Sequence, residues 1–178
     1  MKDALLYMLD ALLQLVVWAF LVRLLMQLVR ADFRNPFAGA IVTITNPVIL
    51  PLRKLLPPVG RLDTASLVAV IGVQLAAQAL ILLAAAGAAA PFPLLLREAL
   101  IALATNTTYV LSGAIFISVI LSWVSQGGYH PLAAVFTSLS RPALRPFQKL
   151  IPPLGGLDLS PVFALIVLQA LRILIARA

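Results

Sequence analysis

The chain has 178 residues, of which 62% are hydrophobic and only 11% charged, and its formal net charge is +7. A soluble domain is about half apolar and about a quarter charged, so this composition predicts a membrane protein. The chain has no cysteine and a single histidine, His130, which argues against disulfides, iron–sulfur clusters, thiolate zinc sites and histidine metal centres.

The thirteen Lys and Arg residues are spread along the chain and mostly lie beside apolar segments. This distribution is typical of a topology signal and of contact with anionic lipid head groups. It disfavours direct nucleic-acid binding, for which a concentrated basic patch is the usual sign.

The first apolar segment covers residues 4–29, which is long enough to cross a hydrocarbon core of about 30 Å. It lacks the basic start and small-residue cleavage site of a signal peptide, so we expect it to be retained. Asp10 and Arg23 lie inside it and are about 20 Å apart along a helix, too far to pair. We expect Arg23 to reach the nearby interface with its long side chain.

A motif loop over residues 30–63 follows, and the loop over residues 125–160 repeats it. The first copy, NPFAGAIVTITNPVILPLRKLLPPVGRLD, aligns without a gap with the second, HPLAAVFTSLSRPALRPFQKLIPPLGGLD. The residues retained in both copies are mainly those that shape the backbone. They are Pro36, Pro47, Pro51, Pro57, Pro58 and Gly60 in the first copy, and Pro131, Pro142, Pro146, Pro152, Pro153 and Gly155 in the second.

Each motif copy predicts a helix that starts at its first proline, Pro36 or Pro131. We expect it to break before Pro47 or Pro142, and a second short helix to bend at Pro51 or Pro146. The apolar and basic positions of this second part favour a broken amphipathic helix lying in the membrane interface. A re-entrant pair of half-helices around a polar cavity is the alternative. The cavity would then be lined by Thr43, Thr45, Asn46, Ser138, Ser140 and Arg141.

Three further apolar segments cover residues 65–90, 99–124 and 161–176. Pro91 to Pro93 should end the first of them, with a short turn at Arg97 and Glu98. Gln74 and Gln169 occupy equivalent positions, and we expect both to form hydrogen bonds between helices. Arg172 and Arg177 should mark the exit interface of the last segment.

These segments predict an all-α membrane protein with four transmembrane helices, arranged as two tandem parallel repeats of residues 1–95 and 96–178. Eight cationic residues fall on the side of the motif loops and four on the other side. Because cytoplasmic loops carry the excess of Lys and Arg, we expect the motif loops to face the cytoplasm.

The charged residues of the motif loops are candidate contacts for a partner or for lipid: Arg53, Lys54, Asp63, Arg145, Lys149 and Asp158. One hypothesis is that Asp63 and Asp158 interact with the N-terminus of the following helix, with Ser160 and Pro161 as N-cap and first residue in the second copy. The other is that Asp63 pairs with Lys54 or Arg53, and Asp158 with Lys149, as a binding or switching element. His130 before Pro131 suits a capping position.

No paired carboxylates, nucleophile–base set, phosphate loop or metal-ligand spacing is present in the sequence. We therefore expect no enzymatic activity, no cofactor and no metal site.

The runs DFRNPF, TNPVILPLRKLLPP, GRLDTASL, SWVSQGG and RPALRPFQKLIPPLGGLDLSP together resemble the YggT membrane proteins of bacteria, a family that includes the YlmG proteins of bacteria and plastids. The resemblance covers nearly the whole chain. It implies a protein of the bacterial inner membrane. Members are associated with tolerance of osmotic shock, with cell division and nucleoid organisation, and in plastids with assembly of the cytochrome b6 complex. The resemblance implies no catalytic residues.

Two functions fit the sequence. The first is a non-enzymatic scaffold or assembly factor that binds membrane-protein partners through its motif loops. The second is a small channel or transporter component for ion or solute homeostasis under osmotic shock. Four helices could hardly enclose a pore, so the second function requires a homo-oligomer.

Overall fold

The computed structural model describes residues 1–60, 62–124, 131–151 and 158–177. These residues form six helices: α1 (Lys2–Leu28), α2 (Pro36–Leu55), α3 (Thr64–Ala86), α4 (Phe92–Val124), α5 (Pro131–Leu150) and α6 (Ser160–Ile175). Within the described ranges the one β-type pairing is an isolated bridge between Val59 and Leu62. The predicted all-α architecture is therefore confirmed.

Among the described residues, three helices, α1, α3 and α4, are long and apolar enough to cross a membrane. They are apolar on most of their circumference, as expected of helices that contact lipid. The fourth predicted crossing is α6, which is apolar but has only 16 residues. At 1.5 Å per residue it is about 24 Å long, shorter than a typical hydrocarbon core of about 30 Å.

Helix α4 has 33 residues and begins earlier than the sequence indicates. The predicted turn at Arg97 and Glu98 is wrong, because both residues lie inside the helix. Pro93 sits in the first turn, where proline removes an N–H that has no helical acceptor anyway. The chain reverses instead at Gly87, whose φ of 72° ends α3 in the left-handed conformation that glycine adopts readily.

The motif helices, α2 and α5, begin at Pro36 and Pro131 as predicted, but the predicted break within each is wrong. Each is a 20-residue helix, with Pro47 and Pro51 inside α2 and with Pro142 and Pro146 inside α5. A proline removes one backbone hydrogen bond and displaces the carbonyl four residues earlier, yet a helix continues through it when neighbouring groups compensate. Both motif helices are amphipathic, which agrees with the predicted polar and apolar stripes.

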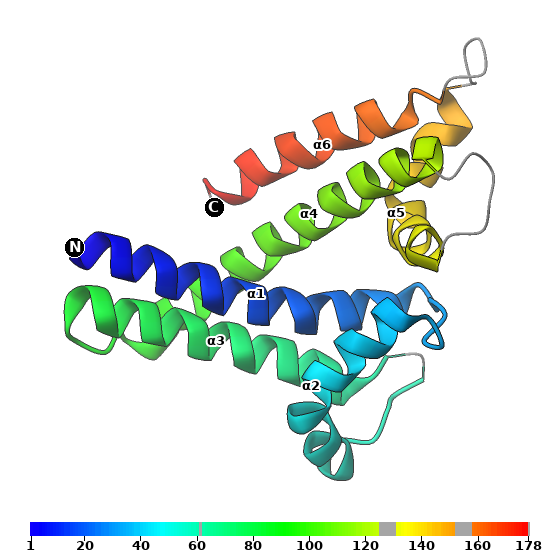
Figure 1. The fold of residues 1–178 in the computed structure, drawn as a ribbon. Coiled ribbons are helices and arrows are strands. Elements are labelled where there is room, and N and C mark those ends of the chain that lie inside the picture. The colour runs from blue at the N-terminus through cyan, green and yellow to red at the C-terminus, as the bar shows by residue number, and fades with distance from the viewer. Residues whose placement is uncertain (61, 125–130, 152–157, 178) are drawn as a thin grey trace.

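Figure 1 shows α2 and α5 at the end of the molecule opposite to both chain termini. Helix α1 packs along α3, and α4 packs against α5 and α6. Helix α2 contacts both α1 and α3, and α5 likewise contacts both α4 and α6. Within its own half of the chain, each motif helix therefore contacts the helix before it and the helix after it.

Equivalent positions build the core of each half. In the first half Phe20, Ile49 and Ala69 pack together, and in the second half their counterparts Ile115, Leu144 and Ala164 do the same. A third core, which includes Met26, Ala38, Ala114, Val135 and Leu139, joins α1 and α2 to α4 and α5. The two halves are thus held together through their motif helices as well as through α3 and α4.

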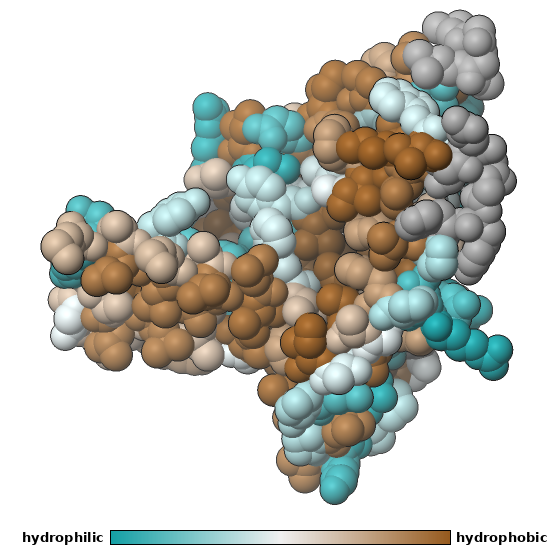
Figure 2. Space-filling view, in the orientation of Figure 1, coloured by the Kyte–Doolittle hydropathy of each residue, from teal (hydrophilic) through white to brown (hydrophobic). Residues whose placement is uncertain are grey.

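Large apolar side chains cover much of the outer surface, as Figure 2 shows along the long helices. Examples are Leu12 on α1, Leu83 on α3, Phe116 on α4 and Ile166 on α6. A soluble monomer rarely exposes so continuous an apolar surface, whereas a membrane protein presents it to lipid.

Candidate functional site at the motif helices

A buried arginine connects α1 to the middle of the first motif helix. Arg23 is only 3% exposed, and its Nη1 donates to the carbonyl of Val42 at 3.2 Å, to Thr45 Oγ1 at 2.6 Å and to Asn46 Oδ1 at 2.9 Å. The prediction that this side chain reaches for the interface is therefore wrong. Its Nη1 is instead bonded to acceptors inside the protein.

Arg23 reinforces the turn of α2 that precedes Pro47. Proline at this position has no N–H to donate, so the carbonyl of Thr43, four residues earlier, loses its helical donor, and the proline ring displaces that turn. Arg23 supplies a donor to that turn, to the backbone at Val42 and to the side chains of Thr45 and Asn46. Buried polar groups are costly unless they are bonded, so Arg23 stabilises a proline-containing helix at this site.

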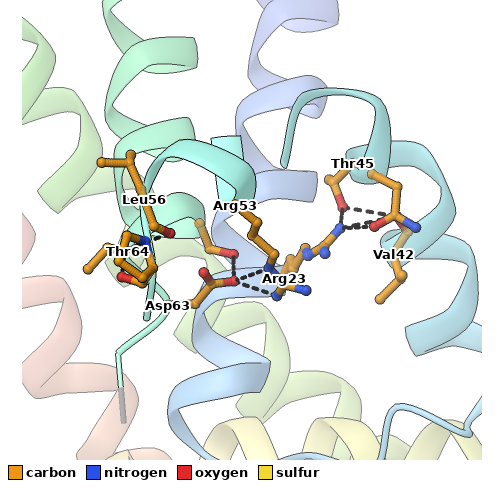
Figure 3. Close-up of polar contacts among 10 residues, drawn as sticks. Arg23, Val42, Thr45, Arg53, Leu56, Asp63 and Thr64 are labelled. Atoms are coloured by element: carbon orange, nitrogen blue, oxygen red, sulfur yellow. Dashed lines mark hydrogen bonds and ion pairs between the residues drawn. The ribbon is translucent and has the colours of Figure 1, made fainter. Parts of the chain in front are cut away.

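Asp63 lies at the other side of this site, immediately before α3, and is 3% exposed. It accepts hydrogen bonds at Oδ2 from Arg53 Nε at 3.0 Å, from Arg53 Nη2, and from Ser66 Oγ at 2.7 Å. Figure 3 shows Arg23 between Thr45 on one side and Asp63 with Arg53 on the other. We call Arg23, Thr45, Arg53, Asp63 and Ser66 the arginine cluster.

Burial raises the pKa of Asp63, but its hydrogen bonds to Arg53 and Ser66 and the positive charge of Arg53 lower it by more, so the pKa lies below its ordinary value. Asp63 is thus ionised at neutral pH. Of the two predicted partners, Arg53 forms the ion pair, while Lys54 is exposed on the helix surface. The carboxylate also occupies the N-cap position of α3, although its side chain makes no capping hydrogen bond.

The turn between α2 and α3 brings Arg53 and Asp63 together. After α2 ends, Gly60 adopts a φ of 61°, and Val59 and Leu62 exchange two backbone hydrogen bonds of 3.1 Å. Thr64 Oγ1 then donates to the carbonyl of Pro57 at 2.8 Å. The retained residues Pro57, Pro58 and Gly60 therefore lie in this turn. The corresponding residues Pro152, Pro153 and Gly155, and the predicted cap His130, lie outside the described residues.

The second repeat builds the equivalent site with different residues. Asp158 matches Asp63, but it accepts from Gln148 Nε2 at 3.1 Å and from the backbone N–H of Ser160 at 2.8 Å. The predicted partner Lys149 is exposed, and the described residues contain no ion pair to Asp158. Hydrogen bonding from Ser160 lowers the pKa of Asp158, although partial burial opposes this. Ser160 is the first residue of α6 rather than its predicted N-cap.

The C-terminal ends of the two motif helices have the same exposed features. Lys54 and Lys149 point away from the core, and the next residues, Leu55 and Leu150, are 77% and 78% exposed. Arg145 is exposed as well. We call Lys54, Leu55, Lys149 and Leu150 the paired tips. A cation next to an exposed large apolar side chain, present twice, suits contact with lipid or with a protein partner.

Polar contacts also join the two motif helices. The side chain of Asn35 accepts from the N–H of Phe37 at 2.9 Å and so caps α2, while its amide donates to the carbonyl of Pro131 at the start of α5. The ring centroids of Phe37 and Phe136 lie 5.3 Å apart, a distance typical of aromatic packing. The two helices are therefore connected at their N-terminal ends.

A second polar region lies among the long helices. Trp18 Nε1 donates to Asn106 Oδ1 and Asn106 Nδ2 donates to Gln74 Oε1, each at 3.1 Å. The predicted interhelical role of Gln74 is thus confirmed, whereas Gln169 is exposed on α6. A cleft of about 680 Å³ between α1 and α4 opens beside this group, and Asp10, Gln14, Trp18, Asn106 and Tyr109 are among its lining residues.

Arg172 of α6 does not simply mark an exit interface. Its guanidinium lies 3.7 Å from the ring centre of Tyr109, with Nε donating to Thr108 Oγ1 at 3.2 Å. This cation–π contact ties α6 to the polar face of α4. The described residues contain no group of three His, Cys, Asp or Glu side chains that could hold a metal ion.

The sequence prediction of site residues missed Arg23. The signal was available in the alignment of the two halves, since Arg23 matches Ser118, and Arg53 matches Gln148. In both pairs the first repeat has an arginine where the second has a neutral residue, and both positions belong to the site of the retained aspartate, Asp63 or Asp158. A comparison of differences, in addition to identities, would have indicated an ionic site in one half only.

Comparison with known proteins finds one family model, described as CCB3/YggT, which matches residues 2–84 and 98–178. An uncharacterized protein of Pseudomonas aeruginosa is 42% identical over 98% of this chain and 89% of its own length. An uncharacterized protein of Vibrio alginolyticus is 38% identical over 92% of this chain and 88% of its own. The uncharacterized protein YggT of Escherichia coli K12 is 31% identical over 98% of this chain and 90% of its own. No solved structure matches significantly.

Proposed function

Because the chain belongs to the CCB3/YggT family, whose bacterial relatives have no assigned activity, we propose from its own surface that it is a non-enzymatic scaffold or assembly factor of the bacterial cytoplasmic membrane. In this proposal α1, α3, α4 and α6 cross the bilayer as two parallel repeats, and the motif helices lie at the cytoplasmic interface. The processes it serves are those of the cell envelope, of cell division or of osmotic stress.

The paired tips are the observation that carries this proposal. Lys54 with Leu55 and Lys149 with Leu150 are exposed at equivalent positions, although neighbouring positions differ between the copies. The arginine cluster fixes the first tip, because Arg53 lies next to Lys54 and is bonded to a buried aspartate. A pair of basic and apolar tips suits an anionic lipid surface and an acidic, partly apolar segment of a membrane-protein partner.

A charge-reversed double variant tests the proposal. Lys54→Glu with Lys149→Glu should abolish crosslinking to membrane partners, with insertion and melting temperature unchanged because both side chains are exposed. Lys2→Glu with Arg177→Glu is the matched control, since it makes the same charge change at the end that carries the termini. Retention of all crosslinks by the first variant would show that the tips are not the docking surface.

The polar cleft between α1 and α4 favours a second candidate function, a channel or transporter component that works as a homo-oligomer. Its lining includes Asp10, Gln14 and Asn106, polar groups that are rare and usually functional within a membrane. Purified protein in liposomes should then pass ions or small solutes, and Asn106→Leu should slow the flux. Absence of flux over a broad panel of ions and osmolytes would reject this candidate.

A further inference from the structure

A cavity of about 410 Å³ lies in the second repeat, where the C-terminal end of α4 and the middle of α5 meet the start of α6. Its polar lining consists of Ser118, Ser122, Thr137, Ser140 and Asp158, and its other walls are Val119, Trp123, Leu144 and Pro161. We call it the serine cavity. Ser140 is buried within it, and Asp158 contributes its negative charge.

The serine cavity is the counterpart of the arginine cluster. At the constant offset between the halves, Ser118 corresponds to Arg23, Ser140 to Thr45 and Asp158 to Asp63. The apolar walls correspond as well, with Leu144 matching the buried Ile49 of the first core. The cavity therefore lies where the first repeat holds the guanidinium of Arg23.

The arginine cluster and the serine cavity differ mainly in the charge of their side chains. In the first repeat Arg23 and Arg53 both have Asp63 as a charged neighbour. In the second repeat Ser118 and Gln148 replace both arginines, while the carboxylate is retained. Both aspartates precede the N-terminus of a helix, so the helix dipole acts on both in the same way. The two sites therefore differ in their neighbouring cations and not in the helix dipole. The second site keeps the carboxylate of the first site but not its two arginines, and Arg141 replaces the third acceptor, Asn46.

Other cations of the second repeat lie elsewhere. Arg141 and Arg145 line a separate cavity of about 270 Å³ beside Val29 and Ser138, and Lys149 is exposed at its tip. Residues 152–157, which lie outside the described structure, contain no cationic side chain. The described residues therefore provide Asp158 with neutral hydrogen-bond donors only.

We propose that the serine cavity binds the primary ammonium group of a ligand, in the position that Arg23 fills in the first repeat. Arg23 Nη1 bonds three oxygens, those of Val42, Thr45 and Asn46. Thr137 and Ser140 correspond to the first two, and the Ser118 hydroxyl and the Asp158 carboxylate supply further oxygens. A primary ammonium is compact and has three donors, so it suits such a set of acceptors.

The place of the cavity favours an ethanolamine head group as the source of this ammonium. Trp123, at the end of α4, lines the cavity and is 70% exposed, as is typical of aromatic residues at the membrane–water interface. A cavity at that level, with both apolar and polar walls, can accept a head group while the acyl chains stay in the bilayer. A soluble primary amine has the same chemistry and is the second source to be tested.

The test uses the full chain in nanodiscs that contain equal amounts of phosphatidylethanolamine and phosphatidylcholine, whose quaternary ammonium has no N–H donor. Native mass spectrometry should find phosphatidylethanolamine retained at least about tenfold more than phosphatidylcholine. Ser118→Arg places the guanidinium of the first repeat in the cavity and should abolish the preference. Ser138→Arg is the control, because it adds the same side chain to α5 at a half-buried position outside the cavity.

Asp158→Asn keeps the shape of the cavity and removes its charge, so it tests the proposal even if Ser118→Arg does not fold. Like Ser118→Arg, it should abolish the preference for phosphatidylethanolamine over phosphatidylcholine. Loss of the preference in both variants, but not in Ser138→Arg, supports a lipid source. If lipids are retained equally but free ethanolamine raises the melting temperature of the native chain and not of Asp158→Asn, the source is a soluble amine. Equal retention with no effect of ethanolamine, or a preference unchanged by both variants, would overturn the proposal. These outcomes do not depend on the paired tips.

Discussion

At the scale of single residues, two aligned aspartates have different surroundings. Asp63 is buried beside two arginines, whereas Asp158 is bonded to an amide side chain and a backbone N–H. Removing one partner of a buried ion pair costs more than removing an exposed carboxylate, because the remaining charge stays in a poorly solvated site. The two positions therefore form a natural comparison within one chain.

Asp63→Asn should lower the free energy of unfolding by about 2–3 kcal/mol, less than for a fully buried pair because the Arg53 side chain is 44% exposed. Asp158→Asn should cost under about 1 kcal/mol. Both are measured by denaturant titration in detergent micelles. Equal losses for the two variants would contradict the ionic role of the arginine cluster.

The lowered pKa of Asp63 predicts a pH dependence of stability. The carboxylate of an unfolded chain titrates near about pH 4. Because the folded pKa lies below this value, the stabilisation by Asp63 is complete above the unfolded pKa and is lost as pH falls through the folded pKa. Thermal melts between pH 7 and pH 2 should show a steeper acid loss for the native chain than for Asp63→Asn. Parallel curves would contradict the prediction.

At the scale of elements, helix contacts and turns rest on a few polar or flexible residues. Gln74 joins α3 to α4 through Asn106, and its counterpart Gln169 on α6 is exposed. Gly60 reverses the chain between α2 and α3 with a φ of 61°. A single substitution at Gln74 or at Gly60 therefore tests one structural role, the interhelical hydrogen bond or the turn.

Gln74→Leu should lower the free energy of unfolding by about 0.5–2 kcal/mol, since it leaves the amide of Asn106 without its acceptor. Gln169→Leu is the matched control and should have little effect, because that side chain faces outward. Unfolding in mixed micelles measures both variants. A larger loss for Gln169→Leu than for Gln74→Leu would contradict the assignment.

Gly60→Ala should destabilise the chain by about 1–2 kcal/mol, because a residue with a Cβ pays that cost in the left-handed conformation. A Cβ would meet no atom within 4 Å at this position, so the effect comes from the backbone alone. Asn at position 60 tolerates the conformation better and should recover part of the loss, as measured by the same unfolding titration.

At the scale of the whole molecule, the short helix α6 decides how many times the chain crosses the bilayer. Three helices of the described structure have the length and apolarity to span, and α6 has 16 residues. The absence of cysteine allows labelling of single introduced cysteines without a background. Topology can therefore be read directly from which side of the membrane a reagent reaches.

Cysteines at Lys54 and at Pro93 should be labelled from opposite sides, because the motif helices and the α3–α4 turn lie at opposite ends. A cysteine at Arg177 should be labelled from the same side as that at Pro93 if α6 crosses. If the cysteine at position 177 is instead labelled from the same side as the cysteine at position 54, α6 does not cross and the chain has three crossings. Impermeant maleimide on intact cells and on inverted vesicles provides the measurement.

The sequence by itself determined the helical membrane class, the family and the positions of most helix ends. Apolar segment length, proline at Pro36 and Pro131, and glycine at Gly60 act through local chemistry, so they can be recognised without a fold. The two aligned halves also indicated where the retained aspartates and lysines lie.

Only the tertiary structure decided the environment of those residues. Prolines inside α2 and α5 predict a break, but both helices continue through them, and in α2 Arg23 from α1 also bonds the turn before Pro47. Likewise Asp63 and Asp158 look alike in the sequence and differ in burial and in charged neighbours. Both outcomes depend on groups about ten or more residues away, and such contacts follow from packing rather than from local preference.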